Sequence, residues 1–126
     1  MNLKLRYVIL YVSNHEKSKH FYNEILGLPI RGEHGTYIEF ETGSTILSIN
    51  TRESVKEITG LNIAESKTSQ TFELGFVVED VKETIENLRK QDVQILVEPI
   101  EKPWGQVVAY VADPDGHYIE ICSSLD

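Results

Sequence analysis

The stretch that decides the fold is Val8-Ile9-Leu10-Tyr11-Val12-Ser13-Asn14, because its pattern returns 66 residues later as Leu74-Gly75-Phe76-Val77-Val78-Glu79-Asp80. Both copies are rich in β-branched and aromatic residues, which favour strands. Ser13 and Asp80 each have a glutamate three residues later, which is the spacing of a capping box at the start of a helix. The sequence therefore predicts a strand followed by a helix twice, in the same register.

The rest of each half repeats as well. The predicted strands are Leu3–Val12, Tyr37–Phe40 and Thr45–Asn50, with a weaker one at Leu28–Arg31, and then Phe72–Val78, Ile95–Val97, Gln106–Val111 and His117–Cys122. Gly27 ends the first predicted helix, and Gln91–Asp92 ends the second. Pro99 bounds the predicted strand Ile95–Val97. Each half is thus predicted as β-α-β-β-β.

The two halves are predicted to form one domain over residues 1–126. The first module covers about residues 3–50 and the second about 71–123. The connection over residues 51–70 is polar, and within it Glu53–Ile58 has the composition of a short helix.

Composition restricts the partners. The chain of 126 residues has a net charge of −8, which argues against nucleic acid and anionic membranes and favours a cationic or neutral ligand. The single cysteine, Cys122, excludes an intrachain disulfide and a cysteine-based zinc site, so we expect a reducing, cytoplasmic location. The longest apolar stretch, Tyr7–Val12, is too short to span a membrane, and the opening residues lack the pattern of a signal peptide.

Three stretches identify a family. They are Tyr11–Ser18 running into Phe21–Leu28, then Phe76–Val81, and finally Pro103–Gln106 with Asp113-Pro114-Asp115-Gly116-His117-Tyr118-Ile119-Glu120-Ile121. They resemble the vicinal oxygen chelate superfamily, which includes glyoxalase I, bleomycin-resistance proteins and extradiol dioxygenases, over about residues 3–123. The resemblance implies an α+β fold in which two βαβββ modules form an incomplete barrel with helices outside. It also implies a ligand groove between the modules and a homodimer.

Within such a fold, strand alternation assigns the side chains to two faces. The helix-facing set is Val8, Leu10, Val12, Leu74, Phe76, Val78, Ile119 and Ile121. The cavity-facing set is Tyr7, Ile9, Tyr11, Glu73, Gly75, Val77, Tyr118, Glu120 and Cys122.

Metal-using members of the superfamily place ligands at four cavity-facing positions, which the resemblance carries onto Tyr7, Ser48, Glu73 and Glu120. Only Glu73 and Glu120 are good oxygen donors, so two carboxylates and water would hold Mg²⁺ or Mn²⁺ weakly. The four histidines are expected on a helix, a loop and a turn, with His15 and His20 solvated. We therefore expect no tightly held metal, and assign Glu73 and Glu120 as the ligands if one is bound.

The same carboxylates are candidates for catalysis. Two close carboxylates raise one another's proton affinity, and a desolvated glutamate can act as a general base. The alternative is that Glu73 and Glu120 are solvated, or bound to Tyr7 or an arginine. The turn Asp113–Gly116 is expected to have a conformational role, and Cys122 to be an inert buried thiol.

Aromatic and hydroxyl side chains complete the candidate ligand site. The candidates are Tyr7, Tyr11, Ser48, Trp104 and Tyr118, with Tyr37 and Tyr110 as further members of an aromatic lining. Trp104 follows Pro103 in a loop expected at the cavity mouth, where it would stack on a planar ligand or cover it. The alternative is local packing of a large apolar side chain.

The leading hypothesis is a protein that binds a small organic molecule, cationic or aromatic, without a tightly held metal. The alternative is a divalent-metal-dependent lyase, isomerase or dioxygenase that uses Glu73 and Glu120. The sequence does not decide between sequestration and catalysis, and it gives no positive support to a third class, a regulator without a small ligand.

Overall fold

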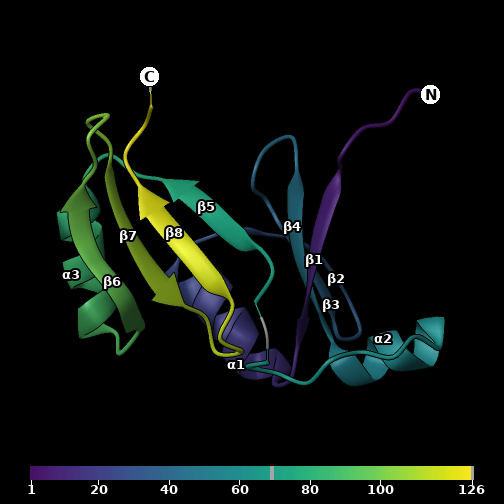
Figure 1. Cartoon of the computed structure of the whole chain (residues 1–126). Coiled ribbons are helices and arrows are strands. Elements are labelled where there is room, and N and C mark those ends of the chain that lie inside the picture. Colours follow the sequence, from purple (N-terminus) through teal and green to yellow (C-terminus); the bar gives the residue numbers. More distant parts are fainter. Residues whose placement is uncertain (69, 126) are drawn as a thin grey trace. The chain divides into compact units, whose positions relative to one another are not determined.

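The chain divides into two compact units, Met1–Ser66 and Lys67–Asp126, in a computed structural model that describes residues 1–68 and 70–125 (Figure 1). The division falls within the polar connection predicted over residues 51–70. Each unit contains one four-stranded sheet, with helical segments in the first unit and the helix of residues 81–90 in the second. None of the helices in residues 1–68 and 70–125 combines the length and apolar character needed to cross a membrane.

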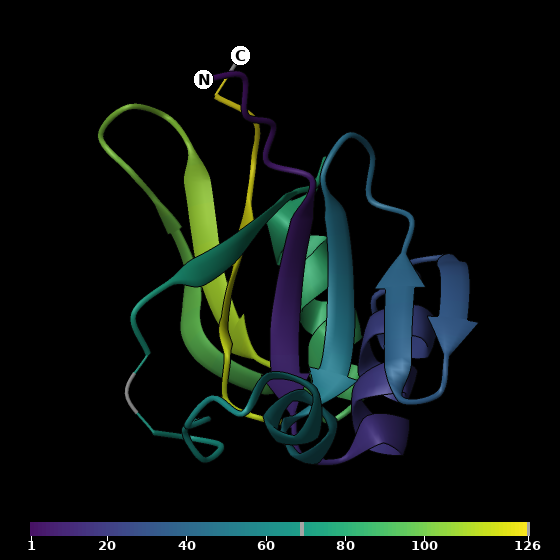
Figure 2. The same cartoon turned by 90° about the vertical axis from the view of Figure 1, so that its right-hand side faces the viewer.

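The first unit is built around β4. Its elements are β1 (Tyr7–Val12), α1 (His15–Lys19), the π-helical turn η1 (His20–Ile25), β2 (Ile30–His34), β3 (Tyr37–Phe40), β4 (Ile46–Thr51) and α2 (Arg52–Thr59). Figure 2 shows the sheet order β1-β4-β3-β2. The strand β1 is parallel to β4, with Ile9 opposite Ser48, and β3 is antiparallel, with Glu39 opposite Ser48.

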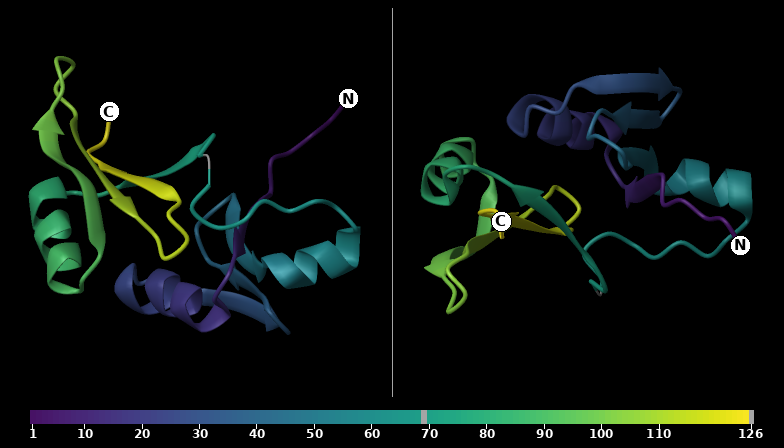
Figure 3. Two further views of the ribbon diagram at one scale, coloured as in Figure 1. Left: turned by 60° about the horizontal axis from the view of Figure 1, so that its bottom comes forward. Right: turned by 90° about the horizontal axis from the view of Figure 1, so that it is seen from above.

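The second unit repeats this arrangement. Its elements are β5 (Glu73–Val77), α3 (Val81–Lys90), β6 (Gln94–Glu101), β7 (Val107–Ala112) and β8 (Tyr118–Cys122), in the sheet order β5-β8-β7-β6. The strand β5 is parallel to β8, with Gly75 opposite Glu120, and β7 is antiparallel, with Tyr110 opposite Glu120. The helix α3 packs against β6, β7 and β8 (Figure 3). The predicted α+β class and the β-α-β-β-β order of both halves are confirmed, and both sheets are open.

Apolar side chains fill one face of each sheet. In the first unit Leu10, Val12 and Phe40 are buried, and the ring of Tyr22 on η1 packs on Phe40 with 5.7 Å between ring centroids. In the second unit Ile85 on α3 is buried together with Ile119. Strand alternation therefore gave the helix-facing sides of β1 and β8 correctly, and Tyr7, Ile9 and Tyr118 on their opposite sides are exposed.

The first helix has a different cap from the predicted one. Asn14, not Ser13, precedes α1 in an extended conformation, and its side chain accepts a hydrogen bond from the Lys17 backbone N–H at 3.0 Å. The Ser13 hydroxyl instead accepts a hydrogen bond from Arg52 Nη1 at 3.0 Å. The predicted cap of α3 is confirmed, because the Asp80 side chain accepts a hydrogen bond from the Glu83 N–H.

Several strand boundaries also differ from the prediction. The strand β6 runs through Pro99 to Glu101, although Pro99 was predicted to bound it. It can do so because β6 is an edge strand whose pairing with β7 is irregular between Val97 and Ile100, so no ladder hydrogen bond is required there. The strand β1 begins only at Tyr7, and β2 extends to His34.

Candidate functional site

Glu73, Tyr110 and Glu120 meet on one face of the second sheet, and we call them the Glu73–Tyr110–Glu120 cluster. The Tyr110 hydroxyl donates to Glu73, at 2.9 Å from Oε2 and 3.2 Å from Oε1, and it lies 3.4 Å from Glu120 Oε2. The three residues come from β5, β7 and β8, and β8 lies between the other two. One phenol oxygen therefore lies within hydrogen-bond distance of two carboxylates.

Gly75 provides the space for this arrangement. It lies opposite Glu120 in the register of β5 and β8, and a Cβ atom at position 75 would lie 3.3 Å from Glu120 Oε1. That distance is shorter than an ordinary van der Waals contact, so a larger residue would displace the carboxylate. The glycine allows the Glu120 side chain to lie across β5.

Tyr110 within the cluster and Cys122 beside it are both neutral at physiological pH, because their pKa values are raised. Burial, the hydrogen bond to Glu73 and the charges of Glu120 and Glu73 raise the pKa of Tyr110 to about 12. Burial, and then the nearby Glu120 carboxylate, also raise the pKa of the Cys122 thiol. The thiol is thus a poor nucleophile, as expected from the sequence. Since a phenol carries a single proton, Tyr110 donates it to Glu73 and leaves acceptor capacity on Glu120.

The first unit carries a polar network of its own. The Tyr37 hydroxyl donates to Glu39 Oε2 at 2.7 Å and lies 3.1 Å from the Ser48 hydroxyl, and Arg31 Nη1 donates to Glu39 Oε1 at 2.7 Å. The hydrogen bond from Tyr37, followed by the interaction with Arg31, lowers the pKa of Glu39 against the opposing effect of burial. Burial raises the pKa of Tyr37. Ser48 is completely buried beneath this network.

The other predicted ligand residues differ in exposure, and of these Tyr7 acts electrostatically on Tyr37. Tyr7 and Tyr118 are exposed, and Tyr11 is half-buried. Trp104 is 64% exposed in the loop between β6 and β7, where its Nε1 donates to Gln106 Oε1 at 2.9 Å. These positions remain candidates, whereas the structure brings Glu73 and Glu120 together through Tyr110.

The sequence could have predicted that Tyr110 lies opposite Glu120, although we predicted it only as a member of an aromatic lining. The turn Asp113–Gly116 fixes the register of the β7–β8 hairpin, because Gly116 N donates to Asp113 O and Asp113 N donates to His117 O. Counting outward from this turn places Tyr110 opposite Glu120. The expected conformational role of the turn is therefore supported.

Two histidines have well-defined environments, and that of His15 differs from the expected one. His117 is buried, and its Nδ1 lies 2.7 Å from Asp113 Oδ2, while Asp113 Oδ1 accepts hydrogen bonds from the N–H groups of Asp115 and His117. This contact stiffens the turn. His15 was expected to be solvated, but its side chain is only 20% exposed, and its Nδ1 lies 3.1 Å from Glu16 Oε1.

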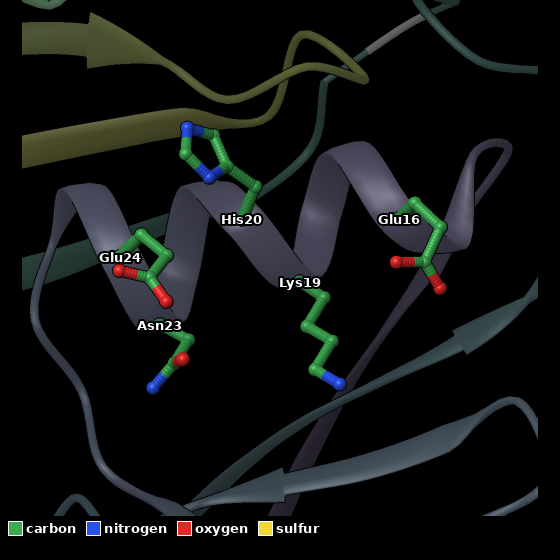
Figure 4. Close-up of a pocket in the computed structure, with 5 residues that line it drawn as sticks. All are labelled: Glu16, Lys19, His20, Asn23 and Glu24. Carbon is green, nitrogen blue, oxygen red and sulfur yellow. The ribbon is translucent and has the colours of Figure 1, made fainter.

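A shallow pocket lies along the helical segment of the first unit. Figure 4 shows its lining residues, Glu16, Lys19, His20, Asn23 and Glu24. Its volume of about 190 Å³ is below the range typical of ligand pockets, and Lys19 already pairs with Glu33 at 3.3 Å. The His20 side chain also points away from those of Lys19 and Asn23. The pocket is therefore a weaker candidate than the cluster on the second sheet.

The four positions carried over for metal ligands do not fit a metal as the side chains are arranged. In the second unit, the Tyr110 hydroxyl donates to Glu73 and lies 3.4 Å from Glu120. In the first, the Ser48 hydroxyl is in contact with Tyr37. Within each unit, no three His, Cys, Asp or Glu side chains of residues 1–68 and 70–125 are grouped to hold an ion.

Comparison with known proteins supports the fold and the family. The family model of the glyoxalase-like domain matches residues 5–126. The uncharacterized protein YraH of Bacillus subtilis (strain 168) is 35% identical over 128 residues, which cover 98% of this chain and 100% of YraH.

Solved structures show the same fold. A glyoxalase/bleomycin resistance protein/dioxygenase from Nocardioides has a TM-score of 0.84 and 22% identity, covering 100% of this chain and 86% of its own. A protein of unknown function from Agrobacterium tumefaciens str. C58 has a TM-score of 0.83 and 29% identity, covering 98% and 96%. Both similarities extend over nearly the whole chain, so they include both units.

Proposed function

Because the chain belongs to the glyoxalase-like domain family, we propose that it binds a small organic molecule, and that the Glu73–Tyr110–Glu120 cluster accepts a cationic group of that molecule. The supporting observation is the unequal sharing of the Tyr110 proton. Glu73 receives the shorter hydrogen bond at 2.9 Å, whereas Glu120 has only the 3.4 Å contact. A half-buried carboxylate with free acceptor capacity favours an N–H donor, and a charged donor most of all.

The other ligand residues predicted from the sequence are proposals as well. Exposed Tyr7, Trp104 and Tyr118 offer aromatic surface to a planar ligand, and Tyr11 and Ser48 stay among the candidate ligand residues. We further propose that binding needs no tightly held metal, that the protein acts in the cytoplasm, and that it forms a homodimer. The net charge of −8 adds a general attraction for cationic ligands.

The test uses benzamidinium as the probe, because its planar cation presents two parallel N–H donors to a carboxylate. Calorimetric titration of the full chain should show binding of benzamidinium, and much weaker binding of the neutral benzamide and of benzoate. We expect Glu120→Gln to weaken benzamidinium binding about tenfold, equivalent to about 1.4 kcal/mol.

Glu101→Gln is the matched control, since it removes the same charge from an exposed position at the end of β6 in the same sheet. We expect it to leave the affinity within about twofold, because exposed charges at a distance are screened. Equal losses in the two variants, or equal binding of benzoate and benzamidinium, would contradict the proposal.

A further inference from the structure

Tyr110 has a geometric consequence for metal binding. A Mg²⁺, Mn²⁺ or Ca²⁺ ion that bridges two carboxylates lies about 2.0–2.6 Å from an oxygen of each. In the second unit, the phenol oxygen of Tyr110 lies 2.9 Å from one carboxylate and 3.4 Å from the other. The hydroxyl therefore occupies the space between Glu73 and Glu120 that a bridging ion would need.

The tyrosine is held in that place by the sheet. It lies on β7, which is paired on both sides, with β8 and with β6. Its partner in the β7–β8 register is Glu120 itself, and its side chain is half-buried. Moving the ring away would cost the hydrogen bond to Glu73 and would separate packed side chains.

We propose that Tyr110 is a selectivity residue, whose hydroxyl prevents a divalent metal from bridging Glu73 and Glu120 and reserves both carboxylates for hydrogen-bond donors. A protonated phenol is a weak ligand for a hard cation, so it does not take part in coordination while it keeps its proton. Its one O–H proton is donated to Glu73, and the phenol oxygen lies 3.4 Å from Glu120. The cluster thus excludes metal ions without losing its negative charge.

The first unit supports the same conclusion from separate residues. Ser48 on β4 corresponds to Glu120 on β8, since they lie opposite Ile9 and Gly75, which are equivalent in the 66-residue repeat. The hydroxyl of Tyr37, from the neighbouring strand β3, lies 3.1 Å from the Ser48 hydroxyl. In both units, therefore, a tyrosine from the adjacent antiparallel strand contacts this position on the last strand.

The test is titration of Mn²⁺ into the full chain, with free Mn²⁺ measured by electron paramagnetic resonance. We expect the wild-type protein to bind Mn²⁺ with a dissociation constant weaker than about 1 mM, and Tyr110→Phe to bind at least about tenfold more tightly. The double variant Tyr110→Phe/Glu120→Gln should lose the gain. Tyr37→Phe is the matched control. It should not increase the affinity for Mn²⁺, because the Glu39 carboxylate that loses the Tyr37 hydrogen bond is still paired with Arg31.

Three results would overturn the proposal. They are wild-type binding of Mn²⁺ tighter than about 10 µM, a Tyr110→Phe variant with wild-type affinity, and a gain that persists in the double variant. Circular dichroism and thermal melting establish that each variant is folded. If Tyr110→Phe does not fold, Tyr110→Leu gives the same test, because it also removes the hydroxyl. Benzamidinium binding is measured in a separate experiment. A negative result there would contradict the proposed function but not the role of Tyr110, and a negative result in the Mn²⁺ titration would contradict only the role of Tyr110.

Discussion

The carboxylate of Glu39 lies between a guanidinium and a phenol hydroxyl. Arg31 and Tyr37 each donate to it at 2.7 Å, and these interactions lower its pKa relative to an ordinary glutamate. A carboxyl group with a lowered pKa in the folded state stabilises the protein above the pKa of the unfolded chain. This stabilisation is lost as the pH falls through the lower pKa of the folded state.

Tyr37→Phe should therefore raise the pKa of Glu39, because the first cause of its lowering is the hydrogen bond from Tyr37. Nuclear magnetic resonance titration of the side-chain carboxyl signals, together with urea unfolding at neutral and acidic pH, measures both effects. We expect the variant to lose less stability on acidification than the wild-type protein. Tyr118→Phe makes the same chemical change on β8 and should leave the Glu39 titration unchanged. An unshifted Glu39 in the wild-type protein would contradict the assignment.

Individual residues differ in how far the sequence predicted them. The repeat and strand alternation placed Glu73 and Glu120 on one face of the sheet, and the structure has them in contact with one hydroxyl. The Arg31–Glu39 pair was not predicted, because the register of β2 against β3 shifts between Ile30 and Gly32. A bulge of this kind changes which side chains are neighbours without leaving a regular pattern in the sequence.

At the scale of elements, the cap of α3 illustrates how a short motif contributes to stability. The Asp80 side chain accepts from the Glu83 N–H at 3.0 Å, which satisfies one of the free donors at the helix start. We expect Asp80→Ala to lower the free energy of unfolding by about 1 kcal/mol, measured by urea denaturation. Glu79→Ala removes an equal charge one residue earlier, outside the cap. It should lower the free energy of unfolding by only about 0.3 kcal/mol. Equal effects would show that charge near the helix start, rather than the cap, is responsible.

The helices also show where pattern recognition fails. In α3 the buried residues Val81, Ile85 and Leu88 follow the ordinary helical period, so the sequence predicted the element. In η1 the backbone widens, and Leu26 N donates to Phe21 O five residues earlier. Phe21 and Tyr22 are both buried there. The spacing of apolar residues is too coarse to separate such a turn from the α-helix that precedes it.

At the scale of the whole molecule, the two halves share their strand topology but differ in their polar side chains. Both units pair their first and last strands in parallel and place the same strand order around them. The side chains at equivalent positions have diverged, with Ser48 in one unit and Glu120 in the other. Backbone pairing depends on the apolar alternation that both halves retain, whereas the opposite face of each sheet can change without loss of the core. This is why the repeat predicted the topology correctly but not the polar networks.

The exposed apolar side chains and the net charge of the chain predict how salt affects the proposed homodimer. Large apolar side chains such as Leu3 and Leu5 are 78% and 75% exposed, and burying such groups favours association. Each chain carries a net charge of −8, so two copies repel one another. Salt screens this repulsion, with a Debye length of about 30 Å at 0.01 M and about 10 Å at 0.1 M. Salt should therefore strengthen the dimer.

Light scattering during size-exclusion chromatography measures this directly. We expect a mass near twice the chain mass of 14.4 kDa at about 0.3 M NaCl, and a lower average mass for the same loaded concentration at about 0.01 M. An association held by opposite charges would show the reverse salt dependence, because screening would then weaken attraction. A mass of one chain at every salt concentration would contradict the homodimer, and it would leave the organic ligand site within a single chain.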